Sequence, residues 1–257
     1  MGNERIRLIT RGDDCGSSKS ANRGILEAYK EGILKNTSVM AVCPALEDAA
    51  ELLAGERELC FGLHAVLNAE WDRVRWGPVL TPEEVPTLVA ADGTFFQTTR
   101  ELCDHGPRLE EMMAEIQAQL NKVRRAGFNV RYADLHMGFD WVNDGFREAF
   151  AMWCGAEGLI NDLELHRRLP KVDSVPGDPV DQLIAKLAAA EPGSYVLVGH
   201  PAYDNEEMRT LGHFGYDGET VAREREWERR IFTDPRVLSF CQLNGIVPAR
   251  YDEVHVP

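Results

Sequence analysis

The sequence lacks several features that assign a chain to a protein class at once. Its six cysteines are scattered and form no Cys-x-x-Cys pair, so we expect reduced, buried thiols rather than a zinc-thiolate site. No stretch approaches the roughly 20 apolar residues that a membrane span needs. The first residues hold no apolar signal segment. We therefore expect a cytoplasmic protein that does not enter a membrane.

Positive charge is also scarce. The chain has 28 Lys and Arg against 42 Asp and Glu, a formal net charge of −14, which disfavours nonspecific binding to nucleic acid. No Gly-x-Gly-x-x-Gly motif follows the first expected strand, so dinucleotide binding has no support. A neutral or small substrate fits this composition better.

Short apolar segments alternate with amphipathic ones along the 257 residues. This alternation predicts parallel strands joined by helical crossovers. We expect a single-domain (β/α) barrel over residues 1–257, TIM-barrel-like with seven or so strands and irregular or incomplete. A doubly wound open sheet is the alternative. The expected strands lie at residues 7–10, 37–43, 59–67, 130–137, 163–169, 195–198 and near 246, and the expected helices at 17–34, 46–53, 109–126, 145–157, 180–190, 219–232 and 235–243.

Residues 68–108 interrupt this pattern with four prolines, acidic pieces and little periodicity. A loop-rich insertion of this length inside a domain is usually functional, as a lid or a binding segment.

Two adjacent acids, Asp13 and Asp14, follow the first expected strand. Two neighbouring carboxylates repel each other, and burial raises the cost, so such a pair persists where a cation or a proton compensates it. The alternative is a solvated turn, because Gly-Asp-Asp also suits turn chemistry.

Other polar residues stand at the ends of later strands: His64, Asp134, His136 and His200. Each histidine taken alone is more often a hydrogen-bonded structural residue. Barrel enzymes, however, build their active sites where the carboxyl ends of the strands converge. The convergence of these residues with the acid pair therefore predicts one site. The remaining histidines, which we expect to face solvent, are His105, His166, His213 and His255.

A carboxylate and two imidazoles form a ligand set for a divalent metal with positions left open for water and substrate. Because adjacent side chains of an extended segment point in opposite directions, one of Asp13 and Asp14 can hold the metal while the other faces its bound water. The metal lowers the pKa of that water, a carboxylate can act as general base, and a histidine can protonate a leaving amine. These parts suit hydrolysis of an amide or an ester.

Five short motifs occur in a specific order: Asp13-Asp14-Cys15-Gly16, Asn22-Arg23-Gly24-Ile25, Gly62-Leu63-His64, Asp134-Leu135-His136 and His200-Pro201. Over about residues 6 to 248 this order resembles the YdjC-type (ChbG/HpnK) carbohydrate deacetylases. The resemblance implies a barrel-like fold, a divalent cation (Mg²⁺ or Zn²⁺) and removal of acetyl groups from N-acetylated sugars.

The resemblance also implies roles for single residues. Asp14, His64 and His136 would be the metal ligands. Asp13 would be the general base that acts on the metal-bound water attacking the amide carbonyl, and His200 would be the general acid.

The chain departs from the family pattern at four positions. Cys15 stands where phenylalanine is usual, and Gly138 where a second histidine is frequent. Gly199 and Ala202 flank His200-Pro201 where cysteine and glycine are common. These departures leave the metal ligands in place, so they bear on the identity of the sugar.

Asp134 is expected either to orient a ligand histidine or to cap a strand end. We expect Arg11 and Arg131 at the surface. Aromatic side chains that could stack on sugar faces, unless they are core or loop anchors, are Trp71, Trp76, Phe95, Phe96 and Trp141.

Two other functions remain open from the sequence. One is a metal-dependent hydrolase of another bond type, such as a phosphoesterase, against which the few basic residues near the motifs argue. The other is a non-catalytic sugar-binding member of the family. The expected partner is a small carbohydrate substrate, and neither nucleic acid nor a membrane is expected. A homodimer formed through the exposed face of residues 109–126 is compatible with the sequence, which shows no clear interface stripe.

Overall fold

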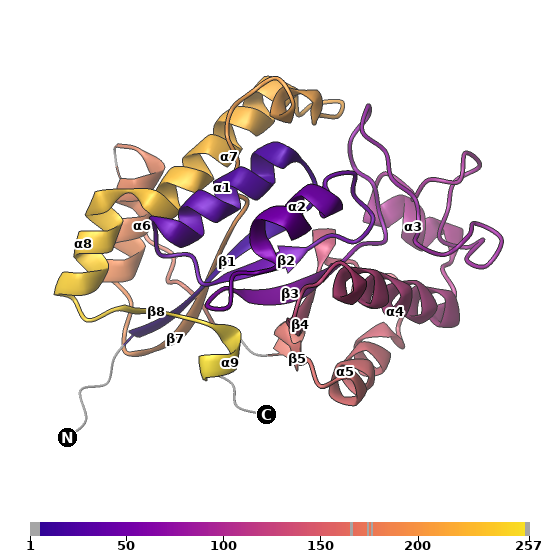
Figure 1. Ribbon diagram of the computed structural model, residues 1–257, viewed down its shortest axis with the longest axis horizontal. Coiled ribbons are helices and arrows are strands. Elements are labelled where there is room, and N and C mark those ends of the chain that lie inside the picture. The colour runs from indigo at the N-terminus through magenta and orange to yellow at the C-terminus, as the bar shows by residue number, and fades with distance from the viewer. Residues whose placement is uncertain (1–5, 165–166, 174, 176, 255–257) are drawn as a thin grey trace.

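A curled sheet of parallel strands forms the centre of the structure, a computed structural model that describes residues 6–164, 167–173, 175 and 177–254 (Figure 1). Seven strands follow the order β5-β4-β3-β2-β1-β7-β6, and β8 pairs with the first half of β1. Among the described residues no pairing joins β5 to β6, so the barrel is incomplete, as predicted. The strands are β1 (Ile6–Cys15), β2 (Asn36–Val39), β3 (Cys60–Ala65), β4 (Val130–Leu135), β5 (Ile160–Asn161), β6 (Arg167–Arg168), β7 (Gly193–Gly199) and β8 (Val247–Ala249).

Helices cover the sheet from outside. Helix α1 packs against α2 and α7, α6 against α7 and α8, and α4 against α5 (Figure 1). The helices are α1 (Lys19–Lys30), α2 (Leu46–Leu53), α3 (Thr99–His105), α4 (Leu109–Arg125), α5 (Phe146–Glu157), α6 (Pro179–Ala188), α7 (Gly218–Thr233), α8 (Pro235–Leu243) and α9 (Tyr251–Val254).

Most expected elements are present, but several of their boundaries were wrong. The strand expected at 7–10 extends to Cys15, and the helix expected at 17–34 ends at Lys30. Ser18 begins that helix by accepting a hydrogen bond from a backbone N–H with its side chain. Of the strand expected at 163–169, only Arg167–Arg168 is a strand among the described residues, and residues 165–166 lie outside them.

Strand β1 lies between β2 and β7, and every residue from Leu8 to Cys15 is buried. The adjacent acids are therefore part of a buried strand, and the solvated-turn alternative was wrong. The register with β2 shifts between Gly12 and Cys15, and Asp14 has a φ of 63°. A non-glycine residue in this left-handed region is strained, and such strain concentrates at functional sites. Here it re-aims the Asp14 side chain at the end of the strand.

The loop-rich insertion is held against the barrel by buried carboxylates. Residues 66–98 contain no helix or strand beyond one isolated bridge, and α3 follows. Glu115 of α4 accepts two consecutive backbone N–H groups of the insertion at 2.8 and 3.0 Å. Glu111, one turn earlier, accepts both the N–H and the hydroxyl of Thr87. These contacts fix the insertion beside the carboxyl ends of the strands.

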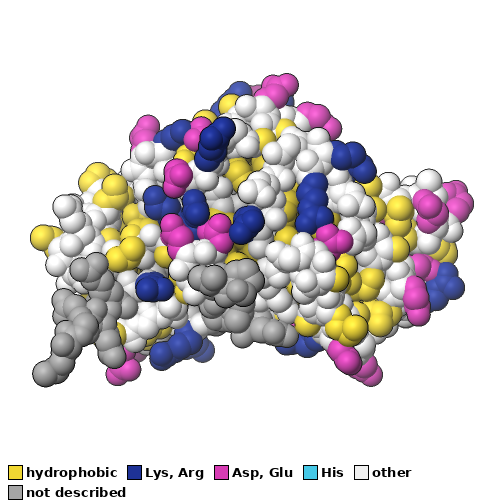
Figure 2. Space-filling model, turned by 60° about the horizontal axis from the view of Figure 1, so that its bottom comes forward, with side chains coloured by type: hydrophobic (Ala, Val, Ile, Leu, Met, Phe, Trp, Pro, Cys, Tyr) yellow, Lys and Arg dark blue, Asp and Glu magenta, His cyan; other side chains and the backbone are white. Residues whose placement is uncertain are grey.

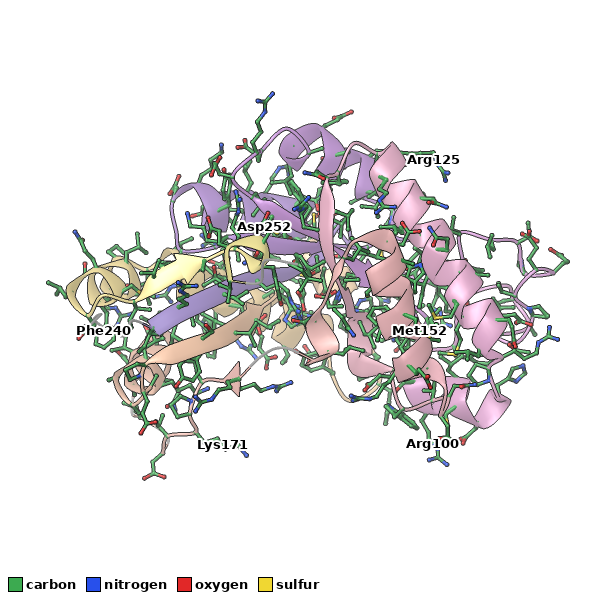
Figure 3. All side chains as sticks on the ribbon, turned by 90° about the horizontal axis from the view of Figure 1, so that it is seen from below. Arg100, Arg125, Met152, Lys171, Phe240 and Asp252 are labelled. Atoms are coloured by element: carbon green, nitrogen blue, oxygen red, sulfur yellow. The ribbon has the colours of Figure 1, made fainter. Side chains whose placement is uncertain are left out.

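The outer surface mixes both signs of charge. On the face shown in Figure 2, acidic and basic side chains are interspersed rather than gathered into a patch of one sign. Met152 of α5 is 71% exposed and lies at the outer side of the α4–α5 layer (Figure 3). Within the described residues, none of the helices combines the length and the apolar character needed to span a bilayer.

Candidate active site and metal centre

Three side chains meet at the carboxyl edge of the sheet: Asp14 of β1, His64 of β3 and His136, which directly follows β4. The Asp14 Oδ1 atom lies 3.5 Å from His64 Nε2 and 3.4 Å from His136 Nδ1. The two histidine nitrogens lie 3.2 Å from each other. All three residues are buried and could hold one metal ion.

The opposite nitrogen of each ring is bonded to a carboxylate. His64 Nδ1 lies 2.7 Å from Asp134 Oδ1, and His136 Nε2 lies 2.9 Å from Glu70 Oε2. Because an ionised carboxylate only accepts hydrogen bonds, each of these ring nitrogens carries the hydrogen. In the neutral rings, the nitrogens that face each other then present lone pairs, which repel unless a proton or a metal cation lies between them. Carboxylate-bound imidazoles of this kind are typical of metal sites.

The spacing and chemistry of the three atoms fit a divalent cation. Ligands bound tetrahedrally at about 2.1 Å lie about 3.4 Å from one another, close to the three observed distances. Within the described part of the chain, Asp14 Oδ1 is buried without a hydrogen-bond donor. Such an orphaned carboxylate oxygen is costly unless a cation or a proton compensates it.

The electrostatics of these groups favour an anionic Asp14 beside positive charge. Burial opposes ionisation of Asp14, but the side chains of His136, His200 and His64 outweigh it and hold its pKa well below the usual range. Burial disfavours the charged form of His136, but Glu70 and Asp14 raise its pKa to about 9.

Arg11 fixes Asp13, the other acid of the pair. Its guanidinium binds both carboxylate oxygens of Asp13, at 2.7 and 3.0 Å, and reaches Asp134 at 2.8 Å and Asp162 at 2.7 Å. Arg11 is buried, so its expected surface position was wrong. Asp13, His64 and Asp134 form a second group that could hold a metal, but this guanidinium already supplies its positive charge. Burial raises the pKa of Asp13 despite the opposing charge of Arg11.

His200 follows β7, the neighbour of β1, and lines the same pocket. Its backbone N–H and its Nδ1 atom both contact Glu228 Oε2, at 2.9 and 3.1 Å. The pocket is lined by both polar and apolar side chains. The polar side chains are Asp13, Asp14, Ser17, Glu70, His200 and Arg225, and the apolar ones are Ala21, Met40, Trp71, Trp76, Ala202, Met208 and Leu211.

Two loops meet over the pocket through stacked rings. Trp71 of the insertion stacks on His213 and Tyr216 of the segment after β7, with ring centroids 6.0 and 6.5 Å apart. The N–H of Asp72 also donates to the carbonyl oxygen of Gly212 at 2.9 Å. The insertion and the loop after β7 therefore form one wall of the pocket.

Helix α1 supports the site through two residues of one motif. Asn22 accepts the N–H of Gly16 at 2.8 Å and so holds the turn after Asp14. Gly24 lies so close to the loop after His200 that a Cβ there would be 2.6 Å from the Pro201 carbonyl oxygen. The absence of a side chain at Gly24 lets that loop pack on the helix.

A family model described as YdjC-like protein matches residues 7–243 of the chain. The chain belongs to this YdjC-like family. Among curated relatives, the "Carbohydrate deacetylase" of Thermoanaerobacter pseudethanolicus is 29% identical, with 95% of this chain and 97% of the relative covered. The "Carbohydrate deacetylase" of Geobacillus stearothermophilus is 28% identical, with 96% and 97% covered.

A solved structure supports the fold of this YdjC-like chain. A crystal structure of an Enterococcus faecalis protein, provisionally named for cellobiose-phosphate cleavage, superposes with a TM-score of 0.80. The superposition covers 98% of this chain and 100% of the Enterococcus faecalis chain, and the two sequences are 20% identical. At this identity the likeness shows the shared fold alone.

The structure brings together most of the site residues that the sequence predicted for this YdjC-like protein. Asp13, Asp14 and His200 line the pocket with Trp71, and Asp134 orients His64. Trp141 is 49% exposed and is not among the residues that line the pocket. Arg131 lies at the surface, as expected.

The other predictions concern the remaining histidines and Cys15. His213 is half-buried against Trp71, so its expected solvent-facing position was wrong, whereas His105 is exposed. His166 and His255 lie outside the described residues. Cys15 packs in the core outside the pocket lining, and burial raises the pKa of its thiol to about 12.

Sequence reasoning missed three charged residues of the site: Glu70, Arg225 and Glu228. Arg225 binds Asp14 Oδ2 and Glu228 Oε2, each at 3.3 Å. Its presence weakens the argument that basic residues are scarce near the motifs. Each of the three is one charge within a charged stretch, with no spacing that singles it out.

Proposed function

We propose that this chain is a metal-dependent hydrolase that removes acetyl groups from an N-acetylated carbohydrate. The observation that carries the proposal is the convergence of Asp14 Oδ1, His64 Nε2 and His136 Nδ1 at 3.2–3.5 Å from one another. A base candidate and an acid candidate line the same pocket. The relatives named carbohydrate deacetylase, which match along nearly their whole length, support the choice of reaction.

Asp14, His64 and His136 would hold the cation. When bound, it would polarise the amide carbonyl and lower the pKa of a water molecule. Two imidazoles and one carboxylate favour Zn²⁺ over Mg²⁺, because Mg²⁺ prefers oxygen ligands and water. Asp134 and Glu70 orient the two rings through their opposite nitrogens.

Asp13 takes the proton from the attacking water. Arg11 grips both of its oxygens, which fixes the carboxylate relative to the pocket. Burial raises the pKa of Asp13 toward neutral pH, which makes its carboxylate a better proton acceptor.

His200, which lines the same pocket, gives a proton to the leaving nitrogen. Trp71, which His213 and Tyr216 support from behind, lines the pocket with Trp76 and other apolar side chains. These side chains would exclude water and offer ring faces on which a sugar can stack. The acetyl group leaves as acetate and the sugar as a free amine.

The proposal is tested by acetate release from N-acetylglucosamine oligomers, with chelated and with zinc-loaded protein. We expect activity only with metal, and losses of about 100-fold or more in Asp13→Asn and His64→Ala. His105→Ala, which removes an exposed histidine outside the site, serves as the matched control.

Equal rates with and without metal would refute the metal mechanism. No acetate from any amide or ester would refute the reaction class. Turnover of phosphate esters instead would favour the phosphoesterase alternative. Sugar binding without any turnover would favour the non-catalytic one. The cytoplasmic location and the homodimer stay predictions.

A further inference from the structure

One carboxylate oxygen on α7 gathers three donors at the edge of the pocket. Glu228 Oε2 lies 2.9 Å from the backbone nitrogen of His200, 3.1 Å from its ring Nδ1 and 3.3 Å from Arg225 Nη1. The second terminal nitrogen of Arg225 lies 3.3 Å from Asp14 Oδ2. A continuous polar chain therefore links His200 to the Asp14 carboxylate that faces the two ligand histidines.

The two contacts from Glu228 hold the histidine at its backbone and at its ring. Because the ionised carboxylate only accepts, the ring must carry its hydrogen on Nδ1, which leaves Nε2 as the nitrogen free to act on a substrate. Although burial would raise the pKa of Glu228, its bond to His200 and the nearby charges lower it, so the group is ionised at neutral pH.

The chain brings β7 unusually close to α7 at this point. A Cβ placed on Gly199 would lie 2.9 Å from the ring of Phe232 and 3.7 Å from the Cβ of Glu228. Either the ring or the strand would have to shift if this position carried a side chain. The glycine before His200 therefore permits the short distance between the histidine and the Glu228 carboxylate.

We propose that Glu228 is a positioning residue, which holds His200 in the tautomer and orientation needed to protonate the leaving amine. This inference rests on the proposed function. As the C–N bond breaks, its electron pair goes to nitrogen, which takes the proton from Nε2 of the doubly protonated His200 ring and leaves the neutral ring. The proton on Nδ1 stays on the ring, hydrogen-bonded to Glu228, and solvent restores the proton on Nε2. Arg225 pairs with Asp14 Oδ2 and with Glu228 Oε2, and so fixes the position of Glu228 relative to Asp14.

The test compares Glu228→Gln with Glu226→Gln in the full-length, zinc-loaded protein. Both variants make the same substitution on one helix, but Glu226 pairs with Arg229 instead. We expect Glu228→Gln to lower kcat for acetate release from an N-acetylglucosamine oligomer by about 10- to 100-fold, with KM changed less than about twofold. Glu226→Gln should keep both constants.

A spectroscopic readout separates positioning from general structural damage. Nitrogen-15 NMR of histidine-labelled protein, with the signal assigned by loss in His200→Ala, should show the hydrogen on Nδ1 in the starting protein and a changed proton distribution in Glu228→Gln. Thermal unfolding and zinc titration should be unchanged in both variants.

Three results would overturn the inference: an unchanged kcat in Glu228→Gln, an effect confined to KM, or an unchanged proton distribution on the His200 ring. A starting protein that releases no acetate refutes the proposed function itself. If the starting protein is active and Glu228→Gln leaves kcat unchanged, this inference alone is refuted.

Discussion

Replacing Glu70 by glutamine should weaken metal binding without disturbing the fold. Glu70 lies outside the metal-ligand set, but its carboxylate accepts the Nε2–H of His136 at 2.9 Å in a buried site. The negative charge makes the opposite nitrogen, Nδ1, a stronger donor to a cation and fixes the direction of the ring. Glutamine is nearly the same size and removes the charge.

The expected magnitude follows from this single contact. Loss of a carboxylate bonded to a ligand histidine typically weakens metal affinity by about 10- to 100-fold, which corresponds to about 1.4–2.7 kcal/mol. We expect the lower half of that range, because the amide oxygen of glutamine can still accept the histidine hydrogen.

The assay is competition for zinc between the protein and a chromophoric chelator, for Glu70→Gln and for Asp72→Asn. Asp72 lies two residues further in the same insertion, is exposed, and accepts from Gln97 rather than from a histidine. Asp72→Asn should therefore bind zinc as the unaltered protein does. If Glu70→Gln, folded with an unchanged melting temperature, keeps its zinc affinity within about twofold, the assigned role of Glu70 is wrong.

Three further predictions test other parts of the structure. Gly24→Ala places a Cβ 2.6 Å from a backbone oxygen of the facing loop and should lower the free energy of unfolding by about 1–3 kcal/mol, measured by denaturant unfolding. Gly55→Ala, with no atom within 4 Å of its Cβ, should be near neutral, and equal effects would contradict the packing argument. Zinc at 100 times its Kd should stabilise the protein by about 2.7 kcal/mol, seen as a higher Tm that is lost in Asp14→Asn; a shift that survives in this variant would place the ion elsewhere. In a thiol-reagent assay at neutral pH, only half-buried Cys103 should react quickly, and rapid reaction of Cys15 would contradict its burial.

The fold class and the ligand candidates could be predicted from the sequence because they follow from local patterns. Apolar segments alternating with amphipathic ones indicate parallel strands, and the carboxyl ends of such strands must converge. Asp14, His64 and His136 stand at those ends, so their meeting required no knowledge of packing. The family motifs supplied the roles of these residues.

The remaining parts of the site depend on long-range packing. Arg11 was assigned to the surface because nothing near it in the sequence shows that Asp134 and Asp162 lie around its guanidinium. Glu70 lies in the insertion and Glu228 on a charged helix, where one more acid carries no signal. The bulge at Asp14 was missed for a related reason, since Gly-Asp-Asp also suits a turn and only pairing with both neighbouring strands extends β1.

The central claim is that one divalent cation lies between Asp14, His64 and His136. Anomalous scattering from a crystal grown with zinc, collected on both sides of the zinc absorption edge, tests it most directly. The account predicts a single strong peak within bonding distance of Asp14 Oδ1, His64 Nε2 and His136 Nδ1. A site without a peak under saturating zinc, or a peak bound by other side chains, would contradict it.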